Sequence, residues 1–127
     1  MHTKQNIASQ AMSAVMNKDR AGWLSCFADD AVLRDPVGGS PLDPDGSGLV
    51  GRDALGKFWD MVVEPAHHVR FDVREEHCSG RSIARAATVY IDLGGAELSY
   101  PGIFVYDLSS SGLIERLCGY FEPPVLD

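Results

Sequence analysis

The chain has 127 residues, of which 45% are apolar and 23% charged, so it is long enough for one core without metal ions or disulfides. Its formal net charge of −7 and the lack of any lysine or arginine cluster exclude nucleic acid and anionic membranes as partners. Three widely spaced cysteines, no apolar leader and no membrane-length apolar run predict a cytoplasmic protein without disulfides. We expect residues 1–127 to form a single domain.

The first half of the chain is patterned mainly as helices. Apolar residues at helical spacing predict a helix over residues 4–17 and a short second helix that ends at residues 28–30. The pattern of residues 31–35 predicts a short strand. Residues 37–51 are rich in glycine and proline, which predicts a loop. A third helix is expected over residues 52–63.

The second half changes to alternating apolar and polar residues, which is typical of strands. Strands are expected over residues 69–73, 87–93, 103–108 and 113–121, with a hairpin turn at Gly94-Gly95. Helices followed by an antiparallel meander predict an α+β fold. A twisted sheet curls, and helices laid across its concave face would enclose an apolar cavity, so an apolar ligand is expected.

The tract from Phe27 to Gly38, which reads FADDAVLRDPVG, carries a family resemblance. It resembles the ketosteroid isomerase and SnoaL-like group of the nuclear transport factor 2-like superfamily, especially uncharacterised actinobacterial members. The GRDAL stretch at residues 51–55 and the aromatic pair Tyr120 and Phe121 fit the same family. The resemblance implies a cone-shaped, curved antiparallel or mixed sheet with three N-terminal helices around an apolar pocket. It also implies a homodimer that forms through the outer sheet face, and no cofactor.

Asp35 is the candidate catalytic residue, because it matches the family's general base. A carboxylate at a strand end beside an apolar cavity is partly desolvated, which raises its pKa and makes it a better base near neutrality. The alternative is ordinary turn chemistry, in which an aspartate before proline accepts backbone N–H bonds.

The family's two oxyanion donors have no acidic or tyrosine counterpart here. The helix-one tyrosine matches Ala11, and the second aspartic acid matches Gly102 or Phe104. Replacement hydroxyls are available on the predicted strands and helix one: Tyr90, Tyr100, Tyr106, Tyr120 and Ser13.

The ligand pocket implied by the resemblance draws on the helices and on the last two strands. Its expected residues are Ala11, Val15, Phe27, Val37, Leu55, Phe58, Trp59, Gly102, Phe104 and Phe121. Trp23 is expected to pack in the core instead. His67 and His68 are adjacent and lack metal-binding spacing, so no metal site is expected.

Three functions follow as alternatives. The first is binding of a steroid-like or other small apolar carbonyl compound with proton transfer by Asp35, as in a Δ5-3-ketosteroid isomerase. The second is a non-catalytic protein that binds the same kind of ligand. The third is cyclase, dehydratase or epoxide-hydrolase chemistry, some of which uses water held by aspartate, arginine and asparagine; the only asparagines are Asn6 and Asn17, in or beside helix one.

Overall fold

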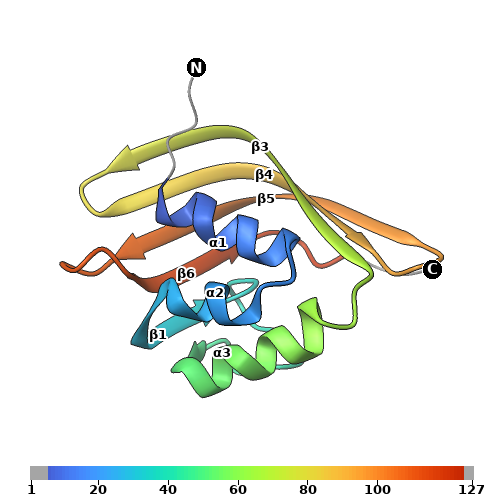
Figure 1. The fold of residues 1–127 in the computed structure, drawn as a ribbon, viewed down its shortest axis with the longest axis horizontal. Helices are drawn as coiled ribbons and strands as arrows, with labels where there is room; N and C mark the ends of the chain where they lie inside the picture. The colour runs from blue at the N-terminus through green and yellow to red at the C-terminus, as the bar shows by residue number, and fades with distance from the viewer. Residues whose placement is uncertain (1–5, 125–127) are drawn as a thin grey trace.

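The computed structural model describes residues 6–124, which form helices packed on a six-stranded sheet (Figure 1). The helices are α1 (Ile7–Met16), α2 (Arg20–Ser25) and α3 (Arg52–Phe58), which continues as the π-helical turn η1 (Trp59–Val63). The strands are β1 (Phe27–Arg34), β2 (Leu49–Val50), β3 (His68–Ser79), β4 (Ser82–Asp92), β5 (Glu97–Leu108) and β6 (Ile114–Tyr120). Within the described residues, none of the helices has the length and apolar character needed to cross a membrane.

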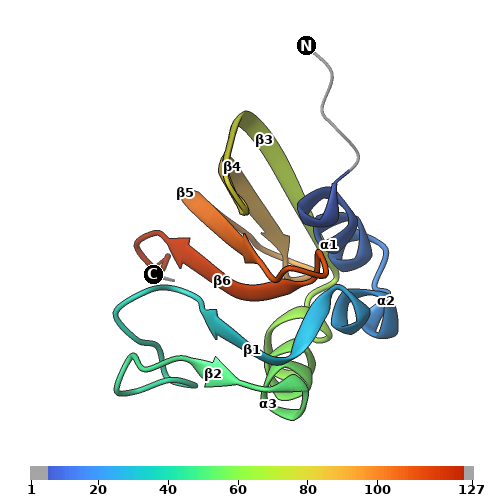
Figure 2. The same cartoon turned by 90° about the vertical axis from the view of Figure 1, so that its left-hand side faces the viewer.

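The sheet has the strand order β2-β1-β6-β5-β4-β3 and is mixed. Strands β3 to β6 form the expected antiparallel meander, while β1 lies parallel to β6 and antiparallel to β2. The sheet is curved and does not close, and the helices cover one of its faces (Figure 2). The predicted α+β architecture, a curved mixed sheet with three helices, is confirmed.

The alternating pattern of β4 decides which side chains face the helices. Ile83, Ala87 and Val89 are buried, while the residues between them are partly exposed. Arg85 shares the buried face and is only 2% exposed. Its guanidinium forms an ion pair of 2.6 Å with Glu76 of β3 and donates a 2.6 Å hydrogen bond to Oγ of Ser9 in α1. This buried charge is therefore paired, and it ties the start of α1 to the sheet.

The second helix is shorter than expected, because the chain turns into β1 at Phe27. Asp29 and Asp30 therefore lie in a strand and not at a helix end. Phe27 pairs with Ile114 of β6, and the Ile114 amide donates to the Cys26 carbonyl at 2.9 Å. This pairing joins segments far apart in the sequence, so a local pattern does not reveal it.

Several other boundaries differ from the expectation, and β4 begins at Ser82 instead of residue 87. The loop over residues 37–51 contains β2, which pairs with β1 through Val50 and Val32. Strand β3 continues past residue 73 to Ser79, and β5 begins at Glu97 because its ladder with β4 continues through Pro101 and Gly102. The expected start of the first helix at residue 4 lies outside the described residues; Asn6 caps α1 by accepting a hydrogen bond from the Ser9 amide.

Candidate active site

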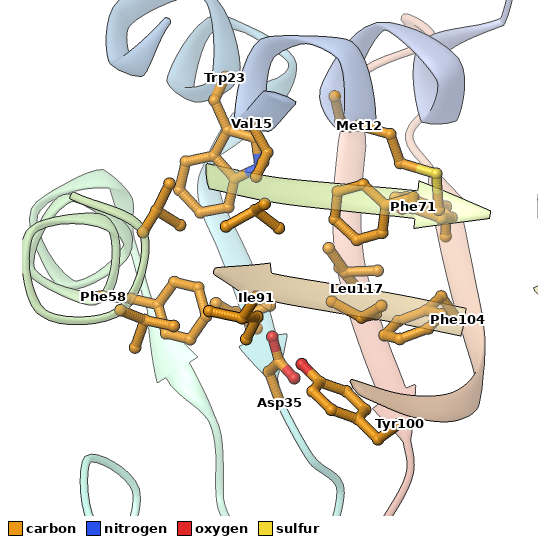
Figure 3. A pocket seen from close by; sticks show the side chains of 17 residues that line it. Met12, Val15, Trp23, Asp35, Phe58, Phe71, Ile91, Tyr100, Phe104 and Leu117 are labelled. Carbon is orange, nitrogen blue, oxygen red and sulfur yellow. The ribbon is translucent and has the colours of Figure 1, made fainter. Parts of the chain in front are cut away.

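A cavity of ≈ 80 Å³ lies between the concave sheet face and the helices (Figure 3). Side chains from all three helical segments and from five strands surround it, and most of them are aliphatic or aromatic. Asp35 is the only charged residue among the described residues that line it, and Tyr100 and Tyr106 add hydroxyl groups. An apolar cavity with a few polar groups is the usual form of a small-molecule site.

The size of the cavity limits what it holds without rearrangement. A water molecule needs about 10–15 Å³ by this measure, so the space has room for roughly six waters. Several lining residues keep solvent contact, among them Asp35, Tyr100 and Val62 of η1, so the cavity is not fully enclosed. A compound with several fused rings would therefore extend beyond this space.

Asp35 follows directly after β1, and the backbone beyond it is held against β6. The Val37 amide donates a hydrogen bond of 2.8 Å to the Gly119 carbonyl. A Cβ atom at Gly119 would lie 3.3 Å from Oδ1 of Asp35, so the glycine leaves the space that the carboxyl group occupies. Protein atoms surround this carboxyl group although the residue keeps some solvent contact, and burial raises its pKa from 3.8 to about 7.

Tyr100 comes from β5 and lies opposite Val89 of β4 on the concave face. Its ring packs against Phe121, with 4.6 Å between the ring centroids. Figure 3 shows the Tyr100 hydroxyl and the Asp35 carboxyl group pointing toward one another. Burial and then the charge of Asp35 raise the pKa of Tyr100 above its usual value, so the hydroxyl stays protonated where Asp35 is ionised.

The other candidate hydroxyls lie on the two faces of the sheet and on α1. Tyr106 lines the cavity and is 3% exposed. The Tyr90 ring lies under the Arg70 guanidinium, 3.9 Å from it, and Tyr120 is 50% exposed. Ser13 is exposed on α1 and accepts a hydrogen bond from the Asn17 side chain.

The expected pocket residues are placed in two groups. Ala11, Val15, Phe58 and Phe104 line the cavity together with Asp35. The other six lie elsewhere: Phe27, Val37, Leu55, Trp59, Gly102 and Phe121.

Packing explains why these six residues do not line the cavity. Phe27 and Trp59 are completely buried and pack against Trp23, with ring centroids at 4.7 and 5.5 Å. Trp23 is buried in the core, as expected, and is also the tryptophan that lines the cavity. Leu55 is also completely buried, whereas Val37 is 40% exposed.

Gly102 and Phe121 form a layer beside the cavity wall. A Cβ at Gly102 would lie 3.1 Å from Cβ of Phe121 and 3.0 Å from the Tyr120 carbonyl oxygen. Phe121 packs against the rings of both Tyr100 and Phe104. These two residues therefore support the wall without forming its surface.

Residues suited to other chemistries lie outside the cavity wall. Asn6 donates to the Glu76 carboxylate, and Asn17 is exposed, so neither lines the cavity. In the described part of the chain, histidine, cysteine and acidic side chains do not converge in a group of three that could hold a metal ion.

Comparisons with known proteins agree with this architecture. The model of a family described as a SnoaL-like domain matches residues 8–117. RV0760c from Mycobacterium tuberculosis is 31% identical, covers 95% of each chain and has a TM-score of 0.88. Its structure in complex with estradiol-17beta-hemisuccinate matches with 32% identity, 91% of each chain and a TM-score of 0.83.

The Δ5-3-ketosteroid isomerase from a Mycobacterium species is 31% identical over 91% of this chain and 90% of that one, with a TM-score of 0.85. A comparison with curated proteins gave no match. The family match spans most of the chain, and the two mycobacterial proteins share its fold over nearly their whole length. The chain therefore belongs to the family of SnoaL-like domains, in the nuclear transport factor 2-like superfamily.

Proposed function

We propose that this protein binds a steroid-like ketone and shifts its carbon–carbon double bond, with Asp35 as the base. The observation that supports this most directly is a carboxyl group with a pKa of about 7 in an otherwise apolar cavity. Near neutral pH such a group both accepts and returns a proton readily. The similarity to a ketosteroid isomerase and to a steroid-bound protein supports the same substrate class.

The proposed reaction conserves every proton. Asp35 removes a proton from the carbon between the carbonyl group and the double bond of a β,γ-unsaturated ketone. The electron pair of that C–H bond forms a new C=C bond, and the carbonyl π pair moves to oxygen, giving a dienolate. Asp35 then returns the proton to the γ-carbon, and the oxygen re-forms the carbonyl bond. The product is the conjugated ketone, and the carboxylate is regenerated.

Asp35→Asn tests this role. Conversion of a 3-keto-Δ5-steroid to its conjugated isomer is followed by ultraviolet absorbance, and steroid binding by the fluorescence of Trp23. We expect kcat/KM to fall by about 10²–10⁴-fold, with binding kept. In the parent, kcat/KM should rise with pH around a midpoint near 7 as Asp35 ionises. Asp30→Asn, at an exposed position of β1, is the matched control. Turnover by Asp35→Asn at the parent rate rules out Asp35 as the base.

A non-catalytic binding protein is the second candidate, and the family's donor positions favour it. Ala11 stands where the family has a tyrosine, and Gly102 or Phe104 stands where it has an aspartic acid. Loss of one oxyanion donor lowers turnover by about 10²–10³-fold in a well-studied enzyme. Saturable quenching of Trp23 fluorescence by a steroid, with no product after long incubation, would establish binding without catalysis.

The outer sheet face supports a proposed homodimer. Ile103 of β5 is 43% exposed and lies opposite Ala86 of β4 and Tyr120 of β6. Together with the neighbouring Val105 these side chains form an apolar area on the face away from the helices. We expect light scattering to give twice the mass of the chain, and Ile103→Lys to give the monomer mass. A parent protein that stays monomeric at high concentration would contradict this assembly.

A further inference from the structure

Two polar groups at the cavity have no hydrogen-bonding partner among the described residues. They are the carboxyl group of Asp35 and the hydroxyl group of Tyr100, and both belong to residues that line the same space. Both residues keep some solvent contact, so neither group is a fully buried polar atom without a partner. A ligand that places a polar atom between the two groups would take the place of solvent as their hydrogen-bonding partner.

The position of Tyr100 is fixed by its surroundings. Its ring packs against Phe121 at 4.6 Å, and its backbone lies in the ladder opposite Val89. The hydroxyl points toward the Asp35 carboxyl group, as Figure 3 shows. Asp35 comes from the end of β1, so two separate elements of the sheet aim their polar groups at one point. A donor held in place before the ligand arrives needs no reorganisation when charge develops on the ligand.

We propose that Tyr100 donates a hydrogen bond to the carbonyl oxygen of the ligand whose neighbouring carbon faces Asp35. As a catalytic role this rests on the proposed isomerase function. The Tyr100 proton stays on its own oxygen throughout, while the negative charge that forms on the ligand oxygen is stabilised by the O–H dipole. The donor thus comes from β5, and it replaces a hydroxyl that the family carries on the first helix, where Ala11 stands here.

Tyr106 is the competing hydroxyl, since it lies on the same face of β5. Its position is further along the strand, opposite Ile83 and Leu117. Burial raises the pKa of both hydroxyls, and the charge of Asp35 adds to the shift of each. Geometry separates the two, because Figure 3 shows the Tyr100 hydroxyl pointing toward the Asp35 carboxyl group. Tyr100 is therefore the hydroxyl assigned to the ligand carbonyl.

Binding of a ketone and its parent hydrocarbon tests the donor without requiring turnover. The probes are 1-tetralone and tetralin, which differ by one carbonyl oxygen, and binding is followed by Trp23 fluorescence. At pH 9 Asp35 is ionised and cannot donate, so a tyrosine supplies the hydrogen bond. We expect Tyr100→Phe to lower the ratio of ketone to hydrocarbon affinity by about five- to tenfold. Tyr90→Phe, on the outer face, should leave the ratio unchanged.

The kinetic test uses the same variants with a 3-keto-Δ5-steroid. Tyr100→Phe should lower kcat by about 10²–10³-fold while the midpoint of the pH profile stays near 7. An unchanged affinity ratio in Tyr100→Phe, or a loss that appears in Tyr106→Phe instead, overturns the assignment. If the parent binds the ketone selectively through Tyr100 but converts no steroid, the donor assignment stands and the proposed isomerase function fails.

Discussion

Replacement of Asp35 by asparagine should make the protein more stable, and increasingly so as the pH rises. The folded protein releases the Asp35 proton near pH 7, whereas an unfolded chain releases it near 3.8. Between these values the unfolded state binds fewer protons than the folded state, so the free energy of unfolding falls with rising pH. The contribution is fully present below pH 3.8 and is lost above about pH 7. Asparagine is neutral at every pH and does not lose it.

The size of the effect follows from the two pKa values. A shift from 3.8 to about 7 corresponds to about 4 kcal/mol once Asp35 is ionised in both states. About 2–3 kcal/mol of this is lost between pH 5 and pH 8. The difference in unfolding free energy between Asp35→Asn and the parent should increase by that amount over this interval.

Urea unfolding of both proteins at pH 5 and at pH 8 measures the difference. Comparison at equal pH cancels the titration of all other groups, and equal protein concentration cancels any effect of subunit association. Asp30→Asn is the control, because its carboxylate is exposed and the same change there removes no buried charge. A difference between Asp35→Asn and the parent that stays constant within about 0.5 kcal/mol from pH 5 to pH 8 would refute burial of an ionised Asp35.

Other residues give further tests. Arg85→Met leaves the Glu76 carboxylate without its buried partner, so we expect the free energy of unfolding to fall by about 3–5 kcal/mol in urea titrations. An unchanged free energy would show that the ion pair is not needed for stability. Trp23→Phe should abolish the fluorescence change on ligand binding, whereas Trp59→Phe should keep it. If Trp59→Phe abolishes the change and Trp23→Phe keeps it, the ligand binds outside this cavity. Gly119→Ala puts a Cβ 3.3 Å from the proposed base and should lower kcat about tenfold or more; an unchanged rate would show that the carboxylate has room to move.

The sequence predicts the architecture well because periodicity reports which face of an element is apolar. The change from helical to alternating spacing located the meander, and the DPVG tract placed Asp35 at the end of a strand. Depth of burial is a different property. Helical spacing shows that Trp23 and Trp59 both face inward, but only the packing of α2 against α3 decides which of them reaches the cavity.

The position of Tyr100 on the cavity face can be derived from the sequence, but Pro101 and Gly102 obscure it. Pro101 and Gly102 are turn residues by composition, so alternation alone predicted a strand from residue 103, and only the family resemblance extended it back to Tyr100. Strand β5 continues through both residues, and side chains two apart share a face. Extending the inward face of Phe104 back by four residues places Tyr100 on the cavity side. The pairing of Phe27 with β6 has no comparable local signal.

The energetics of Asp35 bear on the choice between catalysis and simple binding. A cavity that only holds an apolar ligand gains nothing from a carboxylate whose burial is expected to destabilise the fold at neutral pH. Asparagine or leucine at the same place would bind such a ligand and stabilise the protein. Destabilising groups of this kind persist where activity needs them. Because Gly119 also leaves space for the carboxyl group and Tyr100 faces it, the energetic cost at Asp35 favours proton transfer over passive binding.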